Sequence, residues 1–282
     1  MVLSKPDLDR LVMNALGEDL GEHGSDITTE AVVDRTLRGE AVVVARQPGV
    51  LSGGNAAARV FELVSPSCDY HALLADGARL KAGDKVAGVK GPLASILTGE
   101  RTALNFLQRL SGIATVTRRY ADALAAFPKV TLLDTRKTTP GLRFLERAAV
   151  RAGGGHNHRD GLWDAILIKD NHVAAAGGVT AAIELARRAR IPVEVEVDTL
   201  EQLGEALDAG AETILLDNMS PELMRRSVEI TAGRARLEAS GGMTVEGAVA
   251  AAKAGVDRIS VGALTHSAPA LDLSLEVTKT WR

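Results

Sequence analysis

The chain has 282 residues, of which 46 % are hydrophobic and 24 % charged, as in an ordinary globular protein. A net charge of −3 offers no overall positive field to nucleic acid or to a membrane surface, and 3 % aromatic residues exclude a stacking platform for single-stranded nucleic acid. The single cysteine, Cys68, excludes an intramolecular disulfide and a cysteine-based zinc site, and it favours a reducing, cytoplasmic compartment. No apolar run has the length of a transmembrane helix or the character of a signal-peptide core.

The first part of the chain lacks a regular alternation of strands and helices. Residues 39–54 and 68–91 are rich in strand-forming residues separated by glycine turns, and residues 92–127 follow with a helical pattern. We therefore expect an N-terminal domain of mixed helices and strands over residues 1–110, with its boundary near Leu110–Ile113.

From about Leu110 onward the sequence repeats one pattern, in which a short apolar run ends in polar residues or glycine and a helical segment follows. The apolar runs are 130–133, 165–168, 192–197, 213–216, 235–239 and 258–261. Repeated βα units form a parallel sheet, either closed into a barrel or open and doubly wound. Polar residues at the ends of nearly all these strands favour a barrel, because barrel enzymes build their sites there. We expect an α/β barrel over residues 111–268.

The last residues, 269–282, follow the final barrel unit. Apolar and polar residues alternate along LDLSLEVTKTWR, which is typical of a strand. We expect this tail to return to the N-terminal domain.

Basic residues gather at or near the ends of the first barrel strands. They are Arg136, Lys137, Arg159 and Lys169, with His158 next to Arg159. Cations crowded on one rim repel each other unless an anion compensates them. Arginine binds carboxylate or phosphate in a bidentate way and lysine acts as a compact charge, so the set predicts an anion-binding site.

Two acidic residues, Glu196 and Asp217, end later strands of the same pattern. Magnesium prefers one or two carboxylates together with phosphate oxygens, so these side chains are candidates for a metal site or for contacts to sugar hydroxyls. Ion pairing with the nearby cations is the structural alternative. Glu194 shares a strand face with Glu196 at period two and lies deeper, which indicates a supporting role.

Two glycine-containing turns follow the last two strands, Ser240-Gly241-Gly242 and Ser260-Val261-Gly262. Glycine lets the backbone approach a phosphate closely, and phosphate sites after the late strands are frequent in barrels. The chain carries no paired helical histidines for zinc, no nucleophile elbow and no P-loop. Together the residues indicate a phosphorylated sugar and a carboxylated acceptor as ligands.

Longer motifs resemble one family over essentially the whole chain. DTRKTTPGLR, GGGHNHRDGL, AILIKDNH, VEVEV, ILLDN, ASGG and ISVGALTH occur in order, preceded by EDLG, DITT, GVLSGG, LKAGDKV and GPLASILTGERTALNFLQRLSGIAT. This order is similar to that of the quinolinate phosphoribosyltransferases. The resemblance implies an N-terminal α/β sandwich and an incomplete, seven-stranded α/β barrel.

The resemblance also implies a reaction, in which quinolinate and phosphoribosyl pyrophosphate give nicotinate mononucleotide, pyrophosphate and carbon dioxide for NAD biosynthesis. It implies Mg²⁺ as cofactor and a homodimer, or a hexamer built from dimers, in which Arg101 of TGERTALN crosses to the partner's site. Whether carboxylates hold the magnesium directly or through substrate and water is left open.

Roles carried over by motif fall into three groups. Quinolinate carboxylates would be bound by Arg136, His158, Arg159 and Lys169, with Thr135, Lys137 and Arg101 beside them. Glu196 and Asp217 would hold the ribose hydroxyls and magnesium, and both glycine turns the 5′-phosphate. Lys137, Lys169, Glu196 and Asp217 are the expected catalytic residues.

Two other functions are compatible with the residues: a phosphoribosyltransferase that uses nicotinate, and a non-catalytic phosphosugar-binding protein. The density of cations favours a dicarboxylate over nicotinate, which has one carboxylate. The roles of His156 and His172 are left open.

Overall fold

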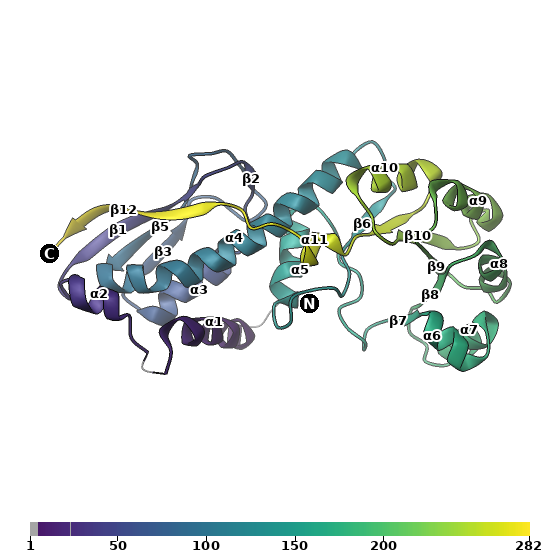
Figure 1. Ribbon diagram of the computed structural model, residues 1–282, viewed down its shortest axis with the longest axis horizontal. Coiled ribbons are helices and arrows are strands. Elements are labelled where there is room, and N and C mark those ends of the chain that lie inside the picture. Colours follow the sequence, from purple (N-terminus) through teal and green to yellow (C-terminus); the bar gives the residue numbers. More distant parts are fainter. Residues whose placement is uncertain (1–4, 23) are drawn as a thin grey trace. The chain divides into compact units, whose positions relative to one another are not determined.

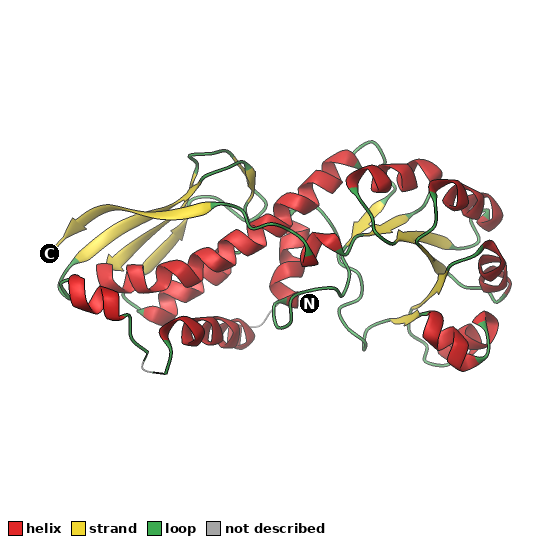
Figure 2. Cartoon of the chain, in the orientation of Figure 1, coloured by secondary structure: helices red, strands yellow, loops and turns green. Residues whose placement is uncertain are grey.

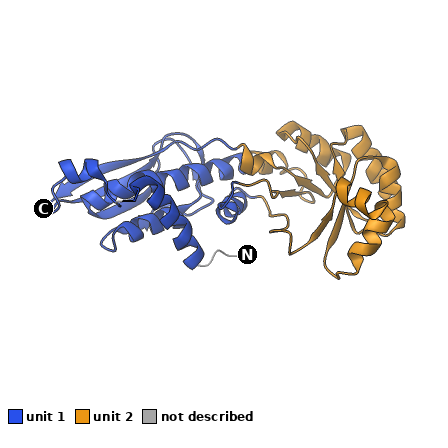
Figure 3. Ribbon diagram, turned by 60° about the horizontal axis from the view of Figure 1, so that its bottom comes forward, with its two compact units in different colours: residues 1–118, 139–154, 268–282 blue, residues 119–138, 155–267 orange. Residues whose placement is uncertain are grey.

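The computed structural model describes residues 5–22 and 24–282, and the chain divides into two compact units (Figure 3). The first unit comprises residues 1–118, 139–154 and 268–282, and the second comprises residues 119–138 and 155–267. Among the described residues, no helix combines the length and the apolar character that crossing a membrane requires.

The first unit is built on a four-stranded antiparallel sheet with the strand order β12-β1-β5-β3 (Figure 1). Its strands are β1 (Arg38–Ala45), β3 (Asp69–Ala72), β5 (Lys85–Pro92) and β12 (Leu273–Trp281), and a separate pair is formed by β2 (Gly49–Val50) and β4 (Arg79–Leu80). The helices that begin in this unit are α1 (Lys5–Leu20), α2 (Ile27–Val32), α3 (Gly54–Val64), α4 (Leu93–Ala123) and α5 (Arg143–Ala152).

A core of small and branched apolar side chains joins these elements. Phe61 of α3 and Leu107 of α4 are fully buried with Val43 of β1 and Val89 of β5. β1 alternates buried and partly buried residues, because successive side chains of a strand point to opposite faces. This burial of apolar surface is the main stabilising term for the unit.

The C-terminal tail forms the edge strand β12, which pairs antiparallel with β1. Residues 139–154, which we expected within the barrel domain, group with the first unit instead. The physical reason is Glu146 of α5, whose fully buried carboxylate accepts hydrogen bonds from Arg109 of α4 (2.8 Å) and from the Thr139 hydroxyl (2.8 Å). A buried carboxylate is stable only with such partners, so α5 stays beside α4.

The second unit is a curved parallel sheet with helices on its outer side (Figure 2), and the strand order is β6-β11-β10-β9-β8-β7. The strands are β6 (Thr131–Leu133), β7 (Ile166–Ile168), β8 (Val193–Val197), β9 (Thr213–Asp217), β10 (Arg236–Ser240) and β11 (Arg258–Ser260). The helices are α6 (Asp170–Ala176), α7 (Val179–Arg187), α8 (Leu200–Asp208), α9 (Pro221–Thr231), α10 (Val245–Ala254) and α11 (Ala263–His266).

The predicted α/β fold class is confirmed, with six strands in this sheet. A seventh parallel segment is reduced to one bridge, between Leu133 and His156. Two residues further on, the backbone N–H of His158 donates to the Asp134 carboxylate (2.8 Å) and does not extend the ladder. The seventh strand therefore ends as soon as it begins.

Leu216 of β9 is fully buried, whereas Leu185 of α7 is 49 % exposed. We expect Leu216→Ala to lower the free energy of unfolding by about 2–5 kcal/mol, because lost burial and a cavity add together. The matched control Leu185→Ala should change it by less than about 0.5 kcal/mol. Urea unfolding measures both, and equal losses in the two variants would contradict the described core.

Candidate active site

A cavity of about 480 Å³ opens at the carboxyl ends of the barrel strands. Its walls come from β7, β8, β9, β10 and β11 and from neighbouring loops, including the loop after β6 and the loop before β7. The lining residues are Thr135, Arg136, Lys137, His158, Arg159, Leu167, Lys169, Glu196, Leu215, Asp217, Asn218, Glu238, Ser240, Gly241, Gly242 and Ser260. The position is the one that barrel enzymes use for catalysis.

The turn after β6 presents Arg136 and Lys137 to this cavity. The Thr135 hydroxyl oxygen accepts the backbone N–H of Lys137 (3.1 Å), and the Thr265 hydroxyl donates to the Lys137 carbonyl (2.7 Å). These hydrogen bonds fix the backbone of the turn from which the side chains of Arg136 and Lys137 extend.

Arg159 lies close enough to Arg136 for their charges to interact. Burial lowers the pKa of the Arg159 guanidinium, and the positive charge of Arg136 lowers it further. Its Nη1 atom donates to the carbonyl of Ala165 (3.0 Å), which holds the side chain in place. Two guanidinium groups held together in one cavity favour an anion between them.

Lys169 lies between the end of β7 and the start of α6, where it is the N-cap residue of the helix. Its ammonium forms an ion pair with Glu196, so both side chains are held at the rim. The ring nitrogen Nδ1 of His172 accepts the backbone N–H of Lys169 (3.0 Å) and caps the start of the helix. This contact gives His172 a structural role.

The glycine run 153–155 lets the chain pass close to α4. A Cβ atom on Gly153 would lie 2.5 Å from the carbonyl oxygen of Ala114 and 2.5 Å from Cβ of Thr117. Gly154 has a φ of +90°, a backbone conformation that glycine adopts at low cost. Larger residues would displace the loop that carries His158.

Asp134 anchors the segment that follows these glycines. It is fully buried and accepts hydrogen bonds from the Asn157 side chain (2.5 Å) and from the backbone N–H of His158 (2.8 Å). His156 bridges to Leu133 through its backbone, and its ring is exposed. His156 thus contributes its main chain to the sheet.

The acidic side of the cavity contains Asp217 and its neighbour Asn218, whose side-chain amide donates to the Asp217 carboxylate (2.6 Å). Asn218 has a φ of +52°, and its backbone N–H donates to the carbonyl of Ser240 (3.0 Å). Gly241 has a φ of +99°, and a Cβ atom there would lie 2.1 Å from Oδ1 of Asn218. Only glycine fits this contact.

The oxygen atoms in this region suit magnesium. Glu196 and Asp217 line one cavity and offer the carboxylate ligands that Mg²⁺ prefers in proteins. Asn218 supplies an amide carbonyl beside them. The residues present therefore fit the ion.

Some lining residues escaped the sequence reasoning, namely Leu167, Leu215, Asn218 and Glu238. Glu238 precedes Ser240 by two residues, so the period-two rule that placed Glu194 was the available signal. Three predicted residues are not among the lining residues described. Val261 is buried, with its backbone N–H donating to the Leu133 carbonyl (3.0 Å), Gly262 follows it, and Arg101 is exposed on α4 of the first unit. Their roles stay predictions.

A parallel α/β barrel with clustered cations, two rim carboxylates and a serine-glycine-glycine turn defines an enzyme site for multiply anionic, phosphorylated ligands. Comparison with known families gives the particular assignment. Residues 26–111 match the N-terminal domain, and residues 113–276 the C-terminal domain, of quinolinate phosphoribosyl transferase. The chain belongs to the quinolinate phosphoribosyl transferase family.

Full-length relatives agree with this assignment. The chain is 43 % identical to a probable nicotinate-nucleotide pyrophosphorylase (carboxylating) of Bacillus subtilis, over 96 % of this chain and 93 % of the relative. It is 45 % identical to the nicotinate-nucleotide pyrophosphorylase (carboxylating) of Mycobacterium leprae, over 94 % and 95 %. The solved nicotinate-nucleotide pyrophosphorylase of Francisella tularensis superposes with a TM-score of 0.92 at 41 % identity, covering 98 % and 97 %.

Gly241 and Gly233 both have left-handed backbones, at φ of +99° and +77°, but only Gly241 has close neighbours. Alanine costs about 1–2 kcal/mol in this conformation at either position. We expect Gly241→Ala to lose about 1–3 kcal/mol more than Gly233→Ala, because its Cβ meets Asn218. Thermal or urea unfolding measures the difference. Equal losses would show that the Gly241–Asn218 contact is not tight.

Proposed function

We propose that the barrel cavity transfers the phosphoribosyl group of phosphoribosyl pyrophosphate to quinolinate. The products are nicotinate mononucleotide, pyrophosphate and carbon dioxide, which makes the protein an enzyme of NAD biosynthesis. The observation that carries the proposal is the set of four cations, Arg136, Lys137, Arg159 and Lys169, around one cavity in a chain of this family. Family membership supports the activity, and the residue roles below are our assignment.

Quinolinate binds through its two carboxylates. Arg136 and Arg159 offer planar guanidinium groups from two different loops, which suits bidentate contacts. Lys169 and Lys137 add point charges, and His158 lies beside Arg159. A dicarboxylate compensates more of this positive charge than nicotinate does, because nicotinate has a single carboxylate.

The phosphoribosyl donor binds on the acidic side of the cavity. Glu196 and Asp217 accept hydrogen bonds from the ribose hydroxyls, and they would hold Mg²⁺ either directly or through substrate and water. The backbones at Ser240–Gly242 and Ser260–Gly262 receive the 5′-phosphate, because glycine allows close approach to N–H groups. When bound, magnesium supplies positive charge to the departing pyrophosphate.

Bond changes then need no covalent side-chain intermediate. The bond between ribose C1 and the pyrophosphate oxygen breaks, and the quinolinate nitrogen donates its electron pair to C1. Glu196 and Asp217 stabilise the positive charge that develops on the ribose, and Lys137 stabilises the leaving pyrophosphate. The 2-carboxylate then leaves as carbon dioxide, its bonding electrons pass to C2 beside the cationic ring nitrogen, and a proton replaces it. Orientation of both substrates contributes much of the rate.

The substrate assignment has a direct assay. The protein is incubated with phosphoribosyl pyrophosphate, Mg²⁺ and either quinolinate or nicotinate, and nucleotide and carbon dioxide are followed. We expect turnover with quinolinate only, because nicotinate lacks the second carboxylate. Turnover with nicotinate alone would refute the specificity, and binding without turnover would indicate a phosphosugar-binding protein.

The Arg159 assignment is tested by substitution. Arg159→Ala should raise the KM for quinolinate roughly 10- to 100-fold, because that is the affinity lost with one hydrogen bond to a charged group. The KM for phosphoribosyl pyrophosphate should stay unchanged. Arg188→Ala, which removes an exposed arginine after α7, is the matched control. Wild-type quinolinate KM in Arg159→Ala means that this residue does not bind the substrate.

We also propose a homodimer, alone or within a hexamer, in which Arg101 completes the partner's site. Chains with Arg101→Ala are mixed with chains carrying Lys169→Ala under conditions that exchange subunits. Hybrid dimers contain one site with both residues intact, so activity should rise above that of either variant. If hybrids form, as seen by mass spectrometry, without such a rise, each site uses its own Arg101.

A further inference from the structure

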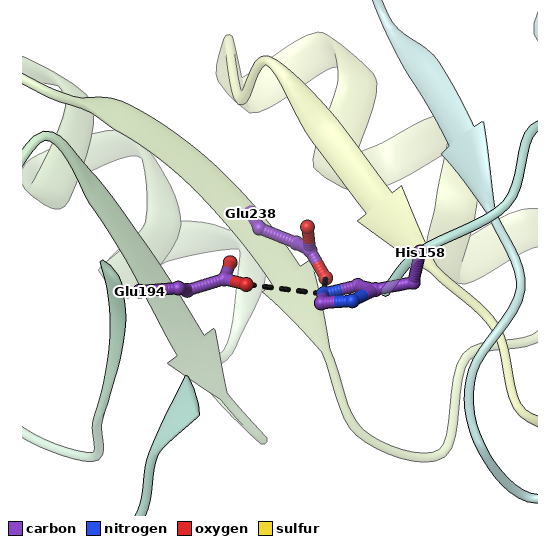
Figure 4. A group of neighbouring side chains, drawn as sticks. All are labelled: His158, Glu194 and Glu238. Atoms are coloured by element: carbon purple, nitrogen blue, oxygen red, sulfur yellow. Dashed lines mark ion pairs between the residues drawn. The ribbon is translucent and has the colours of Figure 1, made fainter. Parts of the chain in front are cut away.

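Three ionisable side chains, from β8, from β10 and from the loop before β7, meet inside the barrel (Figure 4). We call His158, Glu194 and Glu238 the interior cluster. The Nε2 atom of His158 lies 3.0 Å from a Glu194 carboxylate oxygen and 3.4 Å from one of Glu238. Glu238 lines the active-site cavity, Glu194 lines a second cavity of about 520 Å³ at the amino ends of the strands, and His158 lines both. The cluster therefore separates two cavities of the barrel.

Both carboxylates of the cluster are costly to bury. Glu238 is fully buried and Glu194 is 7 % exposed. Among the described residues, neither oxygen of Glu238 has a hydrogen-bond partner, and Oε1 of Glu194 has none. Buried carboxylates with incomplete partners destabilise a fold, often by more than apolar residues of similar size would.

Neighbouring strands show that the barrel does accept apolar residues at this depth. Leu167 of β7 pairs in register with Glu194, and Leu215 of β9 pairs with Glu238. Both leucines line the active-site cavity. Packing alone therefore does not explain glutamates at positions 194 and 238. Unlike the paired leucines, both glutamates contact His158.

The position of the proton on His158 links the cluster to the active site. The backbone N–H of Arg159 donates to Nδ1 of the ring over 2.7 Å, which leaves the proton of a neutral ring on Nε2. Burial lowers the pKa of His158, but the close contacts and negative charges of Glu194 and Glu238 outweigh it and raise the pKa to about 10, which favours the doubly protonated ring. The hydrogen bond from Arg159 requires Nδ1 without a proton, whereas the raised pKa favours a proton on Nδ1 as well. Both observations place a proton on Nε2, between the two carboxylates.

One imidazole and two carboxylates would also make a donor set for a metal ion. A histidine that binds a metal through one ring nitrogen normally donates a hydrogen bond from the other. Here Nδ1 receives the Arg159 N–H instead. The hydrogen bonding of the ring therefore favours a proton over a metal ion at Nε2.

We propose that Glu194 and Glu238 are positioning residues that hold Nε2–H of His158 toward the barrel interior and so fix the ring within the quinolinate subsite. The proposal rests on the proposed function for its substrate. Arg159 follows His158 directly and donates to its ring, so a fixed ring also fixes the backbone that presents Arg159. The two acids act through these neighbours, and we do not place them in contact with substrate.

The kinetic test uses Glu194→Gln and Glu238→Gln, which keep side-chain size and remove the charge. Each should raise the quinolinate KM roughly tenfold and leave kcat and the KM for phosphoribosyl pyrophosphate unchanged. In each single variant the other glutamate remains beside His158, so the change in the free energy of unfolding should be small. Glu205→Gln, an exposed substitution on α8, is the matched control. Wild-type quinolinate KM in both variants, or an equal rise of both KM values with lost stability, overturns the proposal.

A second measurement does not depend on turnover. Nitrogen-15 NMR of the histidine rings, assigned with His158→Gln, should show a protonated Nε2 at pH 7.5 in the wild-type protein. In the double variant Glu194→Gln/Glu238→Gln the pKa of the ring should fall, because the two negative charges that raise it are gone, and the ring should lose its second proton at a lower pH than in the wild-type protein. A wild-type ring protonated on Nδ1 alone overturns the proposal even if quinolinate is the substrate. If Nε2 is protonated but the protein does not turn over quinolinate, the proposed function is wrong, whereas the arrangement inferred for the interior cluster still holds.

Discussion

Side chains alternate along a strand, and this constraint organises the barrel of the second unit. Only every second residue reaches the interior, so polar residues at period two fall into layers. β10 places Arg236, Glu238 and Ser240 at three depths. Arg236 lines the second cavity, at the amino ends of the strands, and the other two line the active-site cavity. β8 repeats this with Glu194 and Glu196. A shift of one residue in the strand register would turn these side chains toward the helices, so the geometry of the site depends on the register.

Charge is the second constraint. Four cations line one cavity, and the pKa of Arg159 is lowered first by burial and then by the positive charge of Arg136. The ion pair of Lys169 with Glu196 offsets part of the charge, and the deeper carboxylates of the interior cluster offset more. In the function that we propose, a doubly anionic acceptor supplies further negative charge, which links the electrostatics of the fold to the choice of substrate.

Sequence reasoning was strongest where a pattern is local. Apolar runs followed by polar residues predicted the barrel strands, because burial and the strand-end position of the site leave a mark in a few consecutive residues. Reasoning was weaker where contacts are distant in the chain. Glu146 groups α5 with the first unit through Arg109, and Asp134 ends the seventh strand by binding the His158 backbone. The partners in these pairs are more than twenty residues apart, so no local pattern contains them.

The sequence by itself determined the alternation of strands and helices, the α/β class and the residue types of an anion-binding site. The ordered motifs also indicated the family. Tertiary structure alone decided which side chains meet. It placed Glu238 beside His158, positioned Asn218 against Gly241, and gave His172 the task of capping α6. The physical reason is that propensity and burial act on neighbours in sequence, whereas hydrogen bonds and charge pairs form only after folding has brought distant residues together.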